Sequence, residues 1–253
     1  YVEDNYELAL MASTYASLIN APLVIQGTSL DSETVFENRN VICVGNVGAH
    51  CSEAYTLEQL QQKYVDETNT DKIILVNPND LGIKVDETFQ PKKSGSSINE
   101  LYSRTSLAAP ILASAKHELI ISTTSTDYSD VDSFIENKIE SLNKDIAYLT
   151  IMASPDAIEM YTDTISTILA SNYRRTVDSW LYGNMDEDDY VELFVGRLFG
   201  ISISDVSSYV TRSVFYDELN SLIQKKTIAG SYDSNLGGFE GTKSFFNNAI
   251  ETG

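Results

Sequence analysis

Short apolar runs alternate along this chain with longer segments in which apolar residues recur every three or four positions. The short runs predict buried strands at residues 23–25, 41–45, 72–77, 119–121, 148–153 and 191–195. The periodic segments predict helices at residues 7–20, 56–64, 106–116, 131–142, 163–173, 204–222 and 242–250. Mainly apolar strands that alternate with helices are typical of a parallel sheet covered on both sides. We therefore expect an α/β fold with mostly parallel, Rossmann-like sheets and helices on both faces.

The first helix and strand have a counterpart about a hundred residues later, a spacing that indicates an internal duplication. The small-residue helix at 106–116 precedes the strand at 119–121 as the helix at 7–20 precedes the strand at 23–25. This recurrence predicts two similar α/β halves packed side by side, residues 1–97 and 98–253. Segment 84–97 contains Pro91, Lys92, Lys93, Gly95 and three serines. We expect it to be an exposed connector, with a linker or a lid as the alternatives.

Composition restricts the classes of partner. The chain of 253 residues has 17 basic and 37 acidic residues, a net charge of −20 and a pI near 4.3. Such a charge argues against nucleic acid and anionic membranes as partners and favours cations or basic surfaces. No run of 18 apolar residues occurs, so we expect no membrane span. Because the chain begins with Tyr1 and not Met, we expect it to be part of a longer protein.

The two cysteines and the two histidines leave several interpretations open. Cys43 lies in an apolar run, and Cys51 follows in a loop. A buried inert thiol and a disulfide between the two cysteines both fit this pattern. A catalytic pair or a metal site at His50 and Cys51 is disfavoured, because side chains of sequence neighbours point apart. His117 is predicted to lie on the surface between a helix and a strand.

Oxygen-bearing side chains are densest between residues 184 and 192. They occur at every second position from Asn184, which resembles the opening D-x-[DN]-x-[DN] of a calcium loop. Asp189 replaces the expected glycine, and the bidentate glutamate twelve positions on is missing. A calcium-bound turn and a solvated acidic turn are the two interpretations. The predicted metal ligands are Asn184, Asp186, Asp188, Tyr190 and Glu192.

The segments YLTIMASPDAIEM and DSWLYGNMDEDDYVELFVGRLFGISISDVSSYV resemble the gingipain-type cysteine peptidases of the caspase–hemoglobinase fold group. The matching positions in the first segment are Pro155, Asp156 and Ile158. Those in the second segment are Asn184, Asp186, Asp188, Val195, Gly196 and Arg197. The similarity covers residues 148–216. Residues 9–27 and 107–121 more loosely resemble the small-residue helix and strand of bacterial and archaeal cell-wall-binding repeats.

The resemblance implies an extracellular protein with a Rossmann-like sheet, but it does not imply activity. Members of the family use a His and Cys dyad on loops that follow the V-G-R strand and its helix. After Arg197 this sequence contains neither a His nor a Cys. We therefore predict no catalytic residue and no organic cofactor in this chain.

Three functions follow from these observations. We expect first an extracellular cell-surface domain with a structural or binding role, whose partners are other surface-protein domains or copies of itself. The alternative is the N-terminal half of an active secreted cysteine peptidase whose His and Cys lie beyond Gly253. A third possibility is a small-molecule site at the carboxyl edge of the sheet, near residues 45–49, Asn77 and Asp156, and this rests on fold analogy alone.

Overall fold

The computed structural model describes residues 1–30, 33–48, 51–84, 102–160, 162–167, 170–176, 181–186, 190–200 and 202–222. The chain divides into two compact units, Tyr1–Val214 and Phe215–Gly253. In the part described for the second unit, helix α8 runs from Tyr216 to Leu222. All other elements below belong to the first unit.

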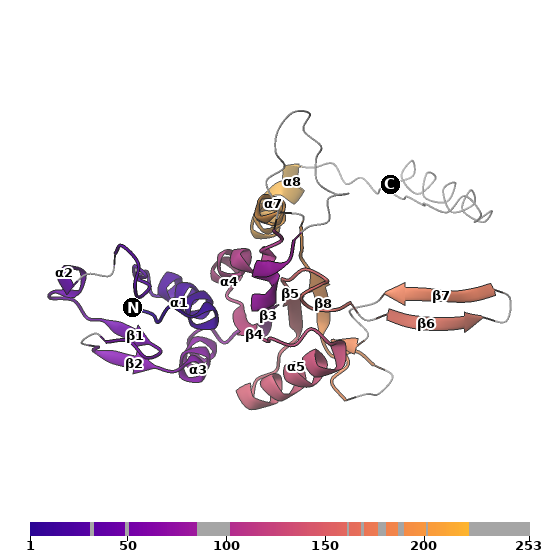
Figure 1. Cartoon of the computed structure of the whole chain (residues 1–253), viewed down its shortest axis with the longest axis horizontal. Helices are drawn as coiled ribbons and strands as arrows, with labels where there is room; N and C mark the ends of the chain where they lie inside the picture. The colour runs from indigo at the N-terminus through magenta and orange to yellow at the C-terminus, as the bar shows by residue number, and fades with distance from the viewer. Residues whose placement is uncertain are drawn as a thin grey trace. The chain divides into compact units, whose positions relative to one another are not determined.

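A four-stranded parallel sheet forms the centre of the first unit (Figure 1). Its strands are ordered β4-β3-β5-β8 and comprise Leu119–Ser122, Lys72–Val76, Tyr148–Ile151 and Phe194–Arg197. Every neighbouring pair runs parallel. Inner strand β3 is buried at all residues but Lys72, as expected for a sheet that is covered on both faces, whereas in β5 only Leu149 and Ile151 are buried. The predicted α/β class with parallel strands is confirmed.

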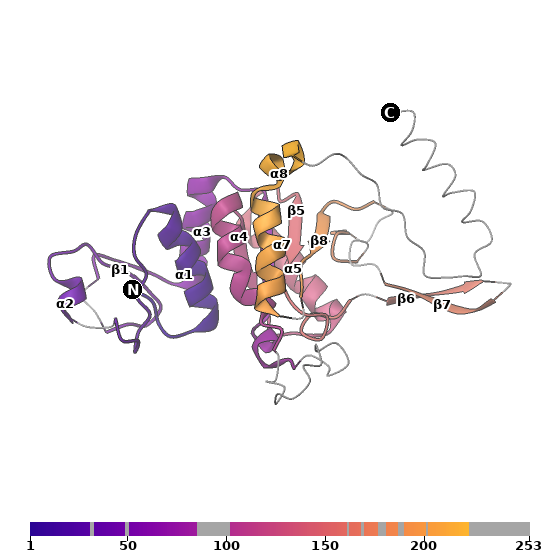
Figure 2. The same ribbon diagram turned by 90° about the horizontal axis from the view of Figure 1, so that it is seen from above.

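Helices cover both faces of this sheet. Helices α4 (Ala109–Lys116) and α7 (Ile203–Val214) lie on one face, and α5 (Tyr128–Leu142) lies on the other (Figures 1 and 2). Val206 and Val210 of α7 are buried, as are Val131 and Ile135 of α5. The two buried residues named for each helix are four positions apart, so each helix presents one apolar stripe to the sheet.

A second, smaller sheet lies near the start of the chain. Strands β1 (Ile42–Val44) and β2 (Glu53–Tyr55) are parallel, and Val2 forms bridges to Val44 and to Ile25. The adjoining helices are α1 (Tyr6–Leu18), α2 (Glu33–Phe36) and α3 (Leu57–Thr68). Thr56 caps α3 through a reciprocal capping box with Gln59, which stabilises the start predicted for this helix.

Helix α3 covers the outer edge of the central sheet. The buried side-chain amide of Gln61 donates a hydrogen bond of 2.9 Å to the carbonyl oxygen of Ile120 in edge strand β4. The Tyr64 hydroxyl donates at 3.4 Å to the carbonyl oxygen of Ala113. The Gln61 contact satisfies a main-chain group that an uncovered sheet edge would leave for another chain, and the Tyr64 contact joins α3 to α4.

The central sheet takes strands from both of the predicted halves, since β3 precedes residue 97 while β4, β5 and β8 follow it. The boundary itself, between residues 97 and 98, lies outside the described residues, as does the predicted helix at 242–250. The division into two similar halves stays a prediction.

Two predicted helices differ in the structure. Residues 163–173 were expected to be helical, but the described ones, 163–167 and 170–173, belong to an antiparallel hairpin of β6 (Thr162–Thr167) and β7 (Ala170–Thr176). The β-branched threonines and isoleucines of this segment favour extended backbone. The predicted helix at 204–222 is interrupted at Phe215, so that α7 and α8 are separate. None of the helices among the described residues is both long and apolar enough to cross a membrane.

Candidate functional site

The acidic turn at 184–192 is closed by main-chain hydrogen bonds. The N–H groups of Glu192 and Leu193 both donate to the carbonyl oxygen of Gly183, at 2.9 and 3.0 Å. The Glu192 carboxylate accepts a bond of 2.8 Å from the N–H of Met185. The end of the turn, at Glu192, therefore lies next to its start, at Gly183 and Met185.

Four of the five predicted calcium ligands can be placed. Asn184 and Glu192 are brought to the same turn, where the Asn184 side-chain oxygen accepts from the N–H of Asp186 at 3.4 Å. Tyr190 is 74% exposed, and Asp188 lies outside the described residues. Carboxylate and amide oxygens suit calcium in kind. The described residues nevertheless contain no group of three His, Cys, Asp or Glu side chains placed to hold a metal, so calcium stays a prediction.

The carboxyl edge of the central sheet holds a buried carboxylate, Asp80, in the short 3₁₀ helix η1 (Pro78–Gly82) after β3. One oxygen accepts from the Ser103 hydroxyl at 3.0 Å and from the N–H of Ser154 at 2.9 Å. The other accepts from the N–H and the hydroxyl of Ser106, at 3.0 and 3.1 Å. Ser106 belongs to the 3₁₀ helix η3 (Thr105–Ala108) that leads into α4. Four donors offset the cost of burying this charge.

Asn77 completes the same edge. Its buried side-chain amide donates to the carbonyl oxygens of Ser125 and Ala157, both at 2.8 Å. These bonds join the end of β3 to the segments that follow β4 and β5. Asp156, which was predicted at this edge, follows β5 and is exposed. The buried polar groups of Asp80 and Asn77 are thus used in holding the strand ends together.

Cys43 and Cys51 form a disulfide with a Cα–Cα distance of 5.6 Å. Cys43 is buried in β1, whereas Cys51 is exposed in the loop before β2. Of the two interpretations of these cysteines, the disulfide holds and the inert thiol is wrong. His50 lies outside the described residues, and His117 is exposed between α4 and β4 as predicted.

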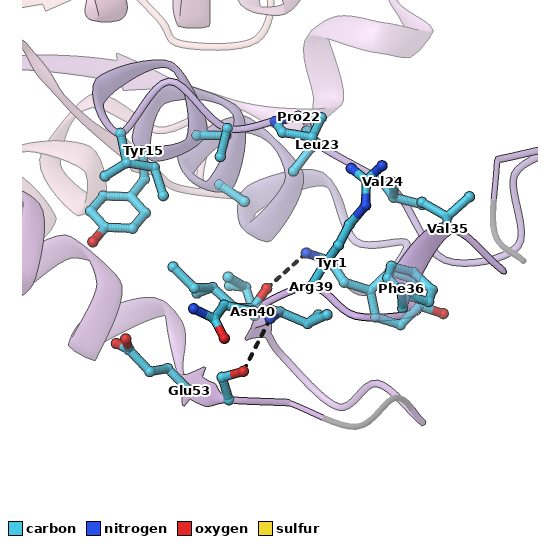
Figure 3. A pocket seen from close by; sticks show the side chains of 18 of the residues that line it. Tyr1, Tyr15, Pro22, Leu23, Val24, Val35, Phe36, Arg39, Asn40 and Glu53 are labelled. Atoms are coloured by element: carbon cyan, nitrogen blue, oxygen red, sulfur yellow. Dashed lines mark hydrogen bonds between the residues drawn. The ribbon is translucent and has the colours of Figure 1, made fainter. Parts of the chain in front are cut away.

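A pocket of about 630 Å³ opens between helix α1, the segment 19–24, helix α2 and strand β1 (Figure 3). Its volume falls in the range of 300–1,000 Å³ that is typical of sites for small molecules. Most of its lining is apolar, and Tyr15, Ala16, Val24 and Val44 are buried in its walls. Sequence reasoning missed this pocket, because single apolar residues from five short segments look like ordinary core residues.

The charged side chains that line the pocket differ in their partners. Arg39 and Glu53 lie at opposite ends of it in Figure 3. Glu53 accepts a hydrogen bond from the hydroxyl of Tyr55. Arg39 is exposed and forms no ion pair with any described residue. The pocket therefore combines an apolar interior with an arginine side chain that has no ion-pair partner among the described residues.

No profile of a known protein family, no curated protein and no solved structure matches this chain. The resemblance to gingipain-type peptidases and to cell-wall-binding repeats rests on the motifs alone and stays a prediction.

Proposed function

We propose that this chain is an extracellular cell-surface α/β domain with a gingipain-like peptidase fold, and that its role is structural or binding rather than catalytic. Its partners are other surface-protein domains or copies of itself, and calcium holds its acidic turn. The observation that carries the proposal is the disulfide between Cys43 and Cys51.

The disulfide supports an extracellular location. Disulfides form and persist in secreted and surface proteins, whereas cytosolic thiols are kept reduced. The bond closes the loop between β1 and β2, in a small sheet that has few strands to stabilise it. A structural bond at this place is useful only where the surroundings are oxidising.

The same bond supports a role without thiol catalysis. Cysteine peptidases attack with a thiolate, and a sulfur that is bonded to another sulfur is not a thiolate. Cys43 and Cys51 are the only cysteines of the chain. The buried carboxylate of Asp80 is bound by four donors, which suits a structural role better than a general base that must accept a proton.

The chemistry of the acidic turn supports calcium as the stabilising ion. Asn184, Asp186 and Glu192 offer hard oxygen ligands within one closed turn. An ion there would lower the mutual repulsion of carboxylates in a chain of net charge −20.

Thermal unfolding during a calcium titration tests this function. The midpoint of the wild-type protein should rise with calcium and fall on addition of a chelator, with about 2.7 kcal/mol gained at a hundred times the Kd. Asp186→Ala should abolish the rise. Glu140→Gln, which removes an exposed carboxylate on α5, is the matched control and should leave the rise intact. An equal midpoint with calcium and with chelator would remove calcium from the proposal.

A further inference from the structure

We infer that the pocket beside α1 is a binding site for a small organic anion, with an apolar body in the cavity and one carboxylate or sulfonate group on Arg39. This inference goes beyond the proposed surface role, and it requires neither the calcium turn nor a particular compartment.

The apolar walls of the pocket favour a ligand with an apolar body. Tyr15 and Ala16 from α1 line the pocket together with Val24 and Val44, and all four are at most 9% exposed. Phe36 of α2 lines the same space, and Tyr1 packs on it with ring centroids 4.8 Å apart. Burial of an apolar body against these side chains removes hydrocarbon surface from water on both partners, which favours binding.

Arg39 favours a ligand that carries an anionic group. Among the described residues that line the pocket, it carries the one positively charged side chain, and no carboxylate of the described chain pairs with it. A guanidinium binds carboxylate and sulfonate oxygens through paired N–H groups. Acidic residues outnumber basic ones by 37 to 17, yet no carboxylate of the described residues pairs with this arginine, so its place beside an apolar cavity favours an anion from outside.

Glu53 determines how the ligand is oriented. Its carboxylate lies at the end of the pocket opposite Arg39 and is held by the Tyr55 hydroxyl (Figure 3). A second anionic group on the ligand would lie near Glu53 and be repelled. The site therefore favours ligands with one anionic end and one neutral end.

Fluorescence titration with two related probes tests the inference. The anionic probe is 8-anilinonaphthalene-1-sulfonate, and the neutral probe is N-phenyl-1-naphthylamine, which has the same rings without the sulfonate. The wild-type protein should bind the anionic probe more tightly. Arg39→Gln should weaken the anionic probe about tenfold, the effect of losing one charge-assisted contact, and leave the neutral probe unchanged.

Two further variants locate the binding. Arg212→Gln removes an exposed arginine of α7 that does not line the pocket, and it should change neither affinity. Ala16→Leu fills part of the cavity from α1 and should weaken both probes, with an unchanged circular dichroism spectrum as the check of folding. Equal effects of Arg39→Gln and Arg212→Gln, or tighter binding of the neutral probe, would overturn the inference. These results do not depend on calcium, so the proposed surface role is judged separately.

Discussion

The carboxylate of Asp80 accepts a hydrogen bond from the main-chain N–H of Ser154 at 2.9 Å, although 74 positions separate the two residues. This bond joins the loop after β3 to the loop after β5. The same carboxylate binds Ser103 and Ser106, which precede α4. One buried side chain thus fixes the carboxyl edge of the sheet against the start of a covering helix.

Replacing Asp80 should therefore destabilise the fold strongly. Asp80→Ala removes the acceptor of four buried donors, of which the Ser103 hydroxyl has a second contact, to Thr105, and we expect a loss of about 3–5 kcal/mol in the free energy of unfolding. Asp80→Asn keeps the shape and one acceptor oxygen, so its loss should be smaller. Urea unfolding at neutral pH measures both. A loss below about 1 kcal/mol for Asp80→Ala would show that these bonds contribute little.

Stability should fall between acid and neutral pH because of Glu118. Burial raises the pKa of this carboxyl to about 7 from its ordinary 4.5, while Lys72 and Lys116 oppose the rise. One carboxylate oxygen is buried with no hydrogen-bond partner among the described residues. The unfolded chain releases this proton at lower pH than the folded chain does. The stability that the protonated Glu118 provides is therefore lost as the pH rises from about 4.5 to about 7.

The neutral variant Glu118→Gln should remove this pH dependence. We expect it to be more stable than the wild type at pH 8 by about 2 kcal/mol and to differ little at pH 4. Thermal unfolding across this range measures the difference. Glu140→Gln on the exposed face of α5 is the control and should show no such trend. A Glu118→Gln protein that is less stable at pH 8 would contradict the burial of this charge.

Two glycines with positive φ form a matched pair for a steric test. Gly27 has φ +76° and open space where a Cβ would lie, whereas Gly45 has φ +83° and would place a Cβ 2.6 Å from atoms of Glu3 and Leu8. Gly27→Ala should cost only the backbone strain, about 1–2 kcal/mol. Gly45→Ala should cost more, because it also displaces the Glu3 carboxylate that accepts from the N–H of Asn46. Equal losses in urea unfolding would show that Glu3 and Leu8 move aside freely.

Removing the disulfide should lower the free energy of unfolding by an amount that depends on the length of the loop between Cys43 and Cys51. For Cys43 and Cys51, which are eight positions apart, the chain-entropy relation gives about 2.5 kcal/mol. We expect this loss for the double variant Cys43→Ala/Cys51→Ala in urea unfolding. A reductant should lower the stability of the wild type but not that of the variant. A variant as stable as the wild type would contradict a stabilising role for this bond.

The fold class could be predicted because buried parallel strands have a local signature. The apolar run at 72–77 became strand β3, and the helix predicted at 7–20 became α1, since in each case one period of apolar residues fits one type of element. The helix predicted at 163–173 was wrong, because the β-branched residues of this segment, at mixed spacing, fit a helical stripe as well as a strand. Backbone preference, which favours extended structure for threonine and isoleucine, decided between the two.

The sites were harder to predict because they depend on tertiary structure. The partners of Asp80 come from positions 103, 106 and 154, and only the strand order β4-β3-β5 brings these loops together. Spacing along the chain does not reveal such a set. The acidic turn was visible because its residues are close in sequence, but closeness alone does not distinguish a metal site from a solvated turn.

A count of free thiols tests the proposed extracellular, non-catalytic role most directly. The protein is produced by export, unfolded without reductant in the presence of N-ethylmaleimide, and its intact mass is measured. Because Cys43 and Cys51 are bonded to each other, we predict no adduct before reduction and two adducts after it. Two adducts without reductant would show that both thiols are free, and would contradict a disulfide-closed surface domain.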